Sequence, residues 1–211
     1  MRRLLIITFL ITPFLTNAQW DMASFKLGAF DPDAAGSGFI IGYEGGTFVD
    51  RNFNYGWSID WFHKNYTDEN LVREFNDEFG FIDSEVNELR AKTNLHDIPL
   101  MFNITGKFPV APKLKAYITG AAGVEALLIF YRSYERPEDD EFKSAFDFAW
   151  RLGAGVNYSL GHRSEFLVEL TYHNSEPSWE FEVEDNGRKR VFERKYDMSG
   201  IMMRLGFRFY Y

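Results

Sequence analysis

Two side chains near the end of the chain have the spacing that nucleophilic chemistry would need. His173 and Ser175 lie two residues apart in the segment TYHNSEP, residues 171–177. A histidine can act as the base that activates a serine hydroxyl when a carboxylate orients its ring. Glu182 and Glu184 are the candidate carboxylates in the sequence. The pattern supports a hydrolase only as an alternative, because such a short spacing often arises by chance.

Elsewhere in the sequence, charged residues alternate with apolar ones. This period of two predicts that the segments containing them are β-strands. In residues 199–211, apolar or aromatic side chains occupy every odd position from Ile201 to Tyr211, and Arg204 and Arg208 lie between them. Successive side chains of a strand point to opposite faces, so this segment has one apolar and one polar face. The same period predicts seven more strands, around residues 25–30, 39–44, 55–62, 97–108, 113–130, 146–160 and 165–173.

The polar faces of these segments carry both signs of charge, whereas the apolar faces carry almost none. A Lys or Arg facing the lipid midplane would cost about 2–4 kcal/mol, so a membrane barrel must turn these faces inward. Side chains just fill the interior of an eight-stranded barrel, which favours ion pairs over an open channel. The predicted lumen ion-pair network is Lys26, Glu44, Asp60, Asp97, Glu125, Asp147, Arg151, Glu169, Arg204 and Arg208. A water-soluble barrel of opposite orientation is the alternative.

The segments between the predicted strands differ in length in a regular way. Residues 51–54, 109–112 and 161–164 are short gaps, whereas 67–94, 132–144 and 174–196 are long ones. Short periplasmic turns and long outer loops are typical of outer-membrane barrels. We therefore expect an all-β fold, an eight-stranded antiparallel transmembrane β-barrel with up-and-down meander topology.

The N-terminal segment predicts that the protein is exported. Arg2 and Arg3 precede the apolar run from Leu4 to Leu15, and Ala18 stands at an expected cleavage position. These features predict a signal peptide over residues 1–18 and a single barrel domain over 19–211, with an N-terminal anchor as the alternative. The chain has 31 acidic and 23 basic residues, which argues against nucleic acid as a partner. Cysteine is absent and the four histidines are scattered, so neither a metal nor a cofactor is predicted.

Five segments carry a resemblance to a known family. LHDIPLMFNITGKF, KLKAYITGAAGVEALL, FAWRLGAGVNYSL, SEFLVELTYHNS and GIMMRLGFRFYY are similar to the outer-membrane β-barrel domain family common in Bacteroidota, known as porin-like or PorT-like. The resemblance implies the barrel fold and a location in a Gram-negative-type outer membrane. It also implies that the aromatic end of the chain, Phe207, Phe209 and Tyr211, is read by the outer-membrane assembly machinery. The functions of this family are diverse, so it implies no specific activity.

The His-x-Ser spacing separately resembles the lipid A deacylase family, although Glu176 replaces the asparagine that follows the serine there. A surface hairpin is predicted at Ser178 to Arg194, continuing the last two barrel strands beyond the membrane, because Asp185-Asn186-Gly187 favours a tight turn. Segments 67–94 and 174–197 are the candidate sites for an extracellular ligand. We expect a non-enzymatic structural or binding barrel that contacts outer-membrane lipids, with a narrow channel and a lipid A deacylase as alternatives.

Overall fold

The computed structural model describes residues 22–67, 92–132, 140–185 and 188–211. The predicted signal peptide and most of segment 67–94 lie outside the described residues. The described secondary structure consists of ten strands: β1 (Met22–Pro32), β2 (Gly38–Phe48), β3 (Phe53–Thr67), β4 (Lys92–Ala111), β5 (Leu114–Arg132), β6 (Asp140–Ser159), β7 (Ser164–Asn174), β8 (Ser178–Asp185), β9 (Arg188–Lys195) and β10 (Gly200–Tyr210). Within the described ranges, none of the elements is a helix suited to crossing a membrane.

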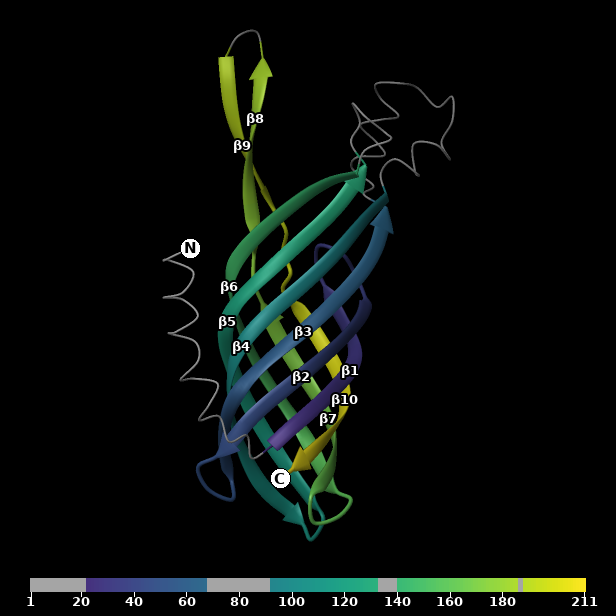
Figure 1. Cartoon of the computed structure of the whole chain (residues 1–211), viewed down its shortest axis with the longest axis vertical. Helices are drawn as coiled ribbons and strands as arrows, with labels where there is room; N and C mark the ends of the chain where they lie inside the picture. Colours follow the sequence, from purple (N-terminus) through teal and green to yellow (C-terminus); the bar gives the residue numbers. More distant parts are fainter. Residues whose placement is uncertain (1–21, 68–91, 133–139, 186–187) are drawn as a thin grey trace, which may run out of the picture.

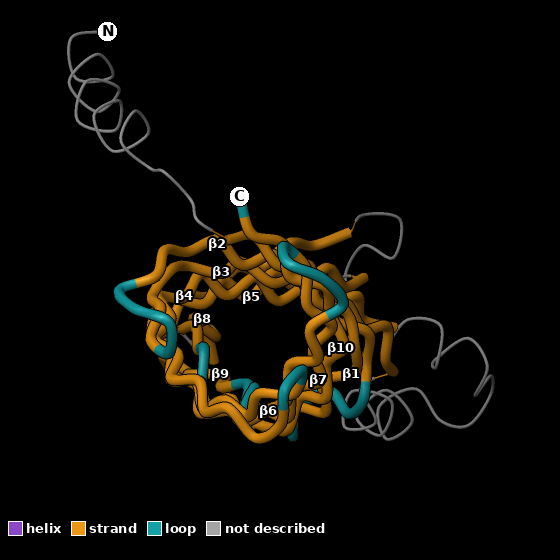
Figure 2. The backbone as a smooth tube through the Cα atoms, turned by 90° about the horizontal axis from the view of Figure 1, so that it is seen from below, coloured by secondary structure: helices purple, strands orange, loops and turns teal. Residues whose placement is uncertain are grey.

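Eight of these strands close into one antiparallel barrel in the order β1-β10-β7-β6-β5-β4-β3-β2 (Figures 1 and 2). Sequence neighbours pair with one another, apart from the β7–β10 pair, which flanks the β8–β9 insertion, and the β1–β10 pair, which closes the barrel. The eight-stranded antiparallel barrel predicted from the period of two is therefore confirmed. The strands are tilted relative to the long axis of the barrel (Figure 1), and they form a complete ring in the end-on view (Figure 2).

The barrel closes where the first and last strands meet. β1 and β10 pair along their whole length, from Met22 opposite Tyr210 to Pro32 opposite Gly200. Gly28 lies in the middle of this seam, and a Cβ there would approach the backbone oxygen of Met203 to 1.9 Å. A residue with a side chain cannot enter this position unless the backbone of β10 moves.

The two faces of each barrel strand have the predicted orientation. In β10, Phe207 is 48% exposed and Arg208 is 1% exposed. Leu170 on β7 is likewise exposed, and its neighbour Glu169 is buried. The apolar residues therefore form the outer surface of the barrel and the charged residues lie inside it. This arrangement is the reverse of a water-soluble core.

The interior is not polar along its whole height, which differs from the sequence-based expectation. At the end nearest the β8–β9 hairpin, inward-facing apolar side chains pack into a cluster that we call the apolar plug. Its buried members are Phe30, Ala35, Ile40, Phe62, Leu95, Leu127, Ile129, Ala145, Tyr196, Met198 and Met202. The rings of Phe30 and Phe62 meet edge to face with centroids 5.1 Å apart. The polar network therefore lies beneath an apolar layer.

The connections divide the barrel into two different ends. Short turns follow β2, β4 and β6, as predicted, and at the first of them Asp50 Oδ1 accepts the backbone N–H groups of Asn52 at 2.7 Å and Phe53 at 2.8 Å. The predicted hairpin is present as a separate two-stranded sheet that projects from the opposite end (Figure 1). It does not extend the barrel sheet itself. Backbone bonds from Met198 N to Ser175 O and from Tyr196 N to Pro177 O, both 3.0 Å, link it to the barrel.

Candidate functional site in the barrel lumen

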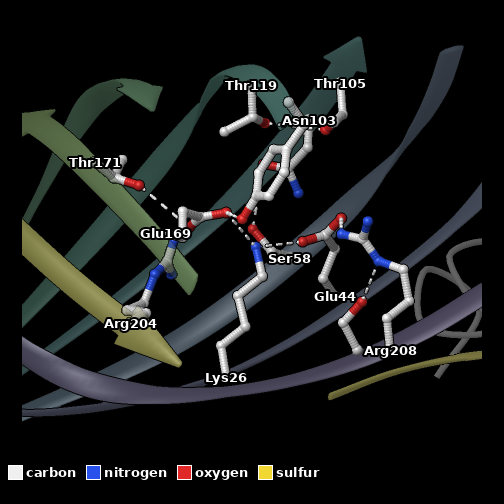
Figure 3. Close-up of polar contacts among 12 residues, drawn as sticks. Lys26, Glu44, Ser58, Asn103, Thr105, Thr119, Glu169, Thr171, Arg204 and Arg208 are labelled. Atoms are coloured by element: carbon white, nitrogen blue, oxygen red, sulfur yellow. Dashed lines mark hydrogen bonds and ion pairs between the residues drawn. The ribbon is translucent and has the colours of Figure 1, made fainter. Parts of the chain in front are cut away.

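A chain of alternating charges crosses the lumen below the apolar plug. Lys26 on β1 places its Nζ 2.6 Å from Glu44 Oε2 on β2 and 2.9 Å from Glu169 Oε2 on β7. Glu44 Oε1 in turn lies 3.2 Å from Arg208 Nη2, and Glu169 binds Arg204. Figure 3 shows the Lys26 ammonium group between the two glutamates, with Arg204 and Arg208 on either side. Side chains from four consecutive strands of the barrel, β2, β1, β10 and β7, therefore meet in its lumen.

The chain of ion pairs continues toward the apolar plug. Arg204 Nη1 lies 3.0 Å from Asp60 Oδ1 on β3, and the other oxygen of Asp60 binds Arg151 on β6. Arg151 then donates from Nε to His173 Nδ1 at 2.9 Å. All of these side chains are at most a few per cent exposed, so their charges are neutralised by one another and not by solvent.

A smaller charged group closes the end that carries the short turns. Lys107 donates to the Tyr210 hydroxyl at 3.0 Å and lies 3.6 Å from Glu165 Oε2, and Lys115 reaches Glu165 Oε1 at 3.4 Å. The ammonium of Lys107 also lies 4.7 Å from the ring centroid of Phe48. An open pocket of about 470 Å³ borders this group at the barrel mouth.

His173 and Ser175 are in contact, but their geometry differs from that of a hydrolase. Ser175 Oγ is 3.3 Å from His173 Nε2 and donates to Glu125 Oε1 at 2.7 Å, while Nε2 also contacts Glu125 Oε2. Since the Arg151 guanidinium can only donate, Nδ1 must accept, and the proton of a neutral His173 ring is on Nε2. That nitrogen therefore cannot take a proton from Ser175. The side chain of the predicted acid Glu184 lies outside the described residues, and Glu125 is the carboxylate that the structure places here.

Two members of the predicted network have other surroundings. Asp147 is half-buried and accepts a hydrogen bond from the backbone N–H of Glu176 at 2.7 Å, so it anchors the segment after β7 instead of joining the axial chain of ion pairs. Asp97 on β4 is fully buried next to Glu125 and His173, and among the described residues neither of its carboxylate oxygens has a hydrogen-bond partner. The other eight predicted members are in contact with at least one polar partner in the lumen.

Sequence reasoning left several partners out of the network. Tyr117 donates to Glu169 Oε2 at 2.9 Å, and Ser24 accepts from Arg208 Nε at 2.8 Å. Lys107 and Tyr210 form the group at the mouth. The alternation that identified the charged members of the network also places these four residues on the inward face of their strands. Their inward orientation could therefore be predicted from the sequence. A neutral residue on that face gives no signal of its own, which explains the omission of Ser24, Tyr117 and Tyr210.

The predicted assembly signal lies at the outer surface near the short turns. Phe207, Phe209 and Tyr211 are 48%, 47% and 65% exposed. Their rings follow one face of β10 to its end, and Phe207 packs edge to face on Phe166 of β7. Recognition of these rings by an assembly machinery remains a prediction.

Comparison with known proteins adds evidence for the fold. No family model and no curated protein sequence matches the chain. A major outer membrane protein from Thermus thermophilus superposes with a TM-score of 0.58 at 13% identity, over 90% of this chain and 99% of that one. Neisserial surface protein A gives 0.54 at 10% identity, over 90% and 95%. At such identities the likeness defines the architecture alone. The chain has the fold of outer-membrane β-barrel proteins, built here from eight antiparallel strands.

Proposed function

We propose that the protein is an integral outer-membrane barrel that acts through the segments it displays at the cell surface, and that neither transport nor hydrolysis is its role. Its outer surface supports insertion into a bilayer, because the exposed positions of the barrel strands are aliphatic and aromatic. Outer-membrane lipids are then its first partners. Export by residues 1–18, assembly through the C-terminal strand and membership of the Bacteroidota-type family belong to the same proposal.

The single observation that carries this proposal is the filled lumen. Lys26 bridges Glu44 and Glu169 inside the barrel at 2.6 and 2.9 Å, and the apolar plug lies between this bridge and one end of the barrel. An ion entering the lumen would have to separate buried ion pairs and then cross an apolar layer. Either step is unfavourable, so the geometry argues against steady conduction.

A planar-bilayer recording tests this part of the proposal. The refolded protein is expected to show no steady conductance above that of the lipid. A folded barrel must be verified in the same sample by its altered gel migration before boiling. Reproducible unitary steps from folded protein would favour the narrow channel instead.

Surface display is the second part of the proposal. The β8–β9 hairpin projects from the end opposite the short turns, which places it outside the cell if the short turns are periplasmic (Figure 1). The sequence of β9 begins with Arg188, Lys189 and Arg190, which trypsin can cleave. Trypsin added to intact cells is expected to cut in this hairpin and leave the barrel strands whole. Cleavage only after the outer membrane is permeabilised would place the hairpin in the periplasm and contradict the proposal.

The geometry around His173 does not favour the deacylase alternative. Both His173 and Ser175 are buried, and the Nε2 proton of His173 is directed to Glu125. We therefore expect a Ser175→Ala variant to leave the acylation pattern of lipid A unchanged when the pattern is read by mass spectrometry. Loss of an acyl chain that depends on Ser175 would restore the hydrolase interpretation.

A further inference from the structure

The buried charges below the apolar plug do not balance. From Arg208 to Arg151 the ion-pair chain alternates four cations with three carboxylates, and Glu125, reached through His173, supplies a fourth carboxylate. Asp97 then adds a carboxylate beyond this set. The excess lysine of the lumen, Lys115, lies at the opposite mouth beside Glu165, where its side chain is 38% exposed. It is therefore not the partner of Asp97.

Asp97 carries this excess charge in a closed environment. The residue is 0% exposed, and neither oxygen of its carboxylate has a hydrogen-bond partner among the described residues. The guanidinium that reaches this cluster, Arg151, binds Asp60 and His173, and its Nη2 is buried without a hydrogen-bond partner in the described part of the chain, so it makes no hydrogen bond to either oxygen of Asp97. A buried carboxylate without a counter-charge costs several kcal/mol in effect, so Asp97 needs either a bound cation or a proton, and the experiment below distinguishes the two.

The surroundings of Asp97 have the dimensions of a cation site. One ligand atom each from Asp97, Glu125 and His173 lies within 4.8 Å of the others. Two oxygens on opposite sides of a Ca²⁺ ion, each about 2.3–2.6 Å from it, have a similar separation. Ser175 Oγ adds an oxygen at 2.7 Å from Glu125 Oε1. Three different strands and the segment after β7 converge here.

His173 determines which kind of cation fits. Because Arg151 donates to Nδ1, the ring keeps its proton on Nε2, where it faces Glu125. A protonated nitrogen cannot bind a metal, so His173 orients the Glu125 carboxylate as an outer partner. Oxygen atoms remain as ligands, and oxygen ligands prefer hard cations. We propose that Asp97, Glu125 and Ser175 form an oxygen-lined site for one hard divalent cation of the Ca²⁺ or Mn²⁺ class inside the barrel.

The position of the site predicts slow exchange of the bound ion. On one side the edge of the Phe30 ring contacts His173, with centroids 5.6 Å apart, and the apolar plug extends beyond it. On the other side the ion pairs of Arg151 and Asp60 cross the lumen. The ion therefore enters during folding, or when the segment that holds Ser175 opens. An experiment has to offer the cation while the barrel forms.

The test is refolding from a chelator-treated, urea-denatured stock into detergent micelles that contain no lipopolysaccharide, which itself binds divalent cations. Wild-type protein is refolded with Mn²⁺, with Ca²⁺, with Zn²⁺ or with no added cation, then desalted. Elemental analysis and Mn²⁺ paramagnetic resonance are expected to find one ion per folded chain. Asp97→Asn should lose the ion. His173→Gln should weaken binding about 10- to 100-fold, as outer partners of metal ligands do.

Glu176→Gln is the matched control, because it removes one exposed negative charge next to Ser175 without touching the ligands. It should retain one ion per chain. Wild-type protein that folds without binding either ion would overturn the proposal. In that case, an Asp97→Asn variant that is more heat-stable than wild type would indicate that Asp97 and Glu125 share a proton. Binding of Zn²⁺ alone would also overturn it, since His173 would then be a ligand. If Asp97→Asn does not fold, the wild-type stoichiometry decides.

Discussion

Glu169 is the residue whose replacement tests the lumen network most severely. Its carboxylate binds Lys26 Nζ at 2.9 Å and Arg204, and it also accepts from the Tyr117 hydroxyl at 2.9 Å. Glu169→Gln preserves the shape of the side chain but removes the charge that both cations face. Each cation keeps one other partner, Glu44 at 2.6 Å for Lys26 and Asp60 at 3.0 Å for Arg204. The variant therefore weakens the network without isolating either cation completely.

The magnitude follows from these contacts. Two hydrogen bonds to charged groups, each contributing about 1.5–3 kcal/mol, are affected: the amide oxygen can still accept from one cation, while the NH2 group can accept from neither. Because both cations keep a partner, we expect the free energy of unfolding of Glu169→Gln to fall by about 3 kcal/mol, at the low end of the ~3–5 kcal/mol seen when a buried pair loses one member.

Urea titration of protein folded in phospholipid vesicles measures this loss. The midpoint should shift to lower urea while the slope stays constant, since the surface exposed on unfolding is unchanged. The exposed Glu176→Gln substitution removes the same charge from the surface and should stay within about 0.5 kcal/mol of wild type. If Glu169→Gln is equally stable, the carboxylate must be solvated, and the lumen would be a water-filled passage instead of an ion-paired interior.

Three further substitutions probe the seam, the apolar plug and the outer face, each read as a change in the free energy of unfolding. Gly28→Ala should cost about 1–3 kcal/mol, because its Cβ meets the backbone of Met203, and an unchanged stability would show that the β1–β10 seam is looser than described. Phe62→Ala should cost about 3–5 kcal/mol by leaving a cavity, whereas a loss below about 1 kcal/mol would mean that the plug is already hydrated. Leu205→Arg should cost about 2–4 kcal/mol in vesicles if this outward residue lies near the lipid midplane, and tolerance within about 0.5 kcal/mol would indicate that it faces water.

The barrel could be predicted from the sequence because its physical constraint acts on every second residue. In β10 the charge of Arg204 and Arg208 has to avoid lipid, so the alternation alone determines which face is inside. The count of eight strands and the two kinds of connection follow from repeating this argument. The hairpin was also predicted, but its separation from the barrel sheet was not. A turn motif predicts a hairpin, but it does not show where the hydrogen bonding between that hairpin and the barrel strands ends.

The apolar plug was missed for a related reason. Phe62, Ile40 and Phe30 occupy the inward phase of their strands, with Ile40 and Phe30 near a strand end and Phe62 well inside the longer β3. Alternation identifies the face of a residue but not its height in the barrel. Only the register between strands shows that these apolar residues lie at one level. The pattern within a single strand cannot give that register.

The cluster around Asp97 shows the same limit. Asp97, Glu125 and His173 come from β4, β5 and β7, and nothing in their sequence spacing brings them together. The sequence predicted Asp97 and Glu125 as members of ion pairs and His173 as a base, since each role depends on residue type alone. Barrel closure creates the convergence, and with it the unpaired carboxylate. The prediction that no metal is bound rested on spacing and could not include such a site.

In a bilayer, the apolar faces of the barrel strands should meet lipid while the charged faces stay sealed inside. The chain contains no cysteine, so single substitutions such as Met203→Cys, Leu205→Cys and Phe207→Cys each accept one nitroxide label. In vesicles, these labels should collide more often with dissolved oxygen, which concentrates in lipid, than with a water-soluble nickel complex. Collision rates with the nickel complex that exceed those with oxygen at all three positions would place this face in water and contradict the claim.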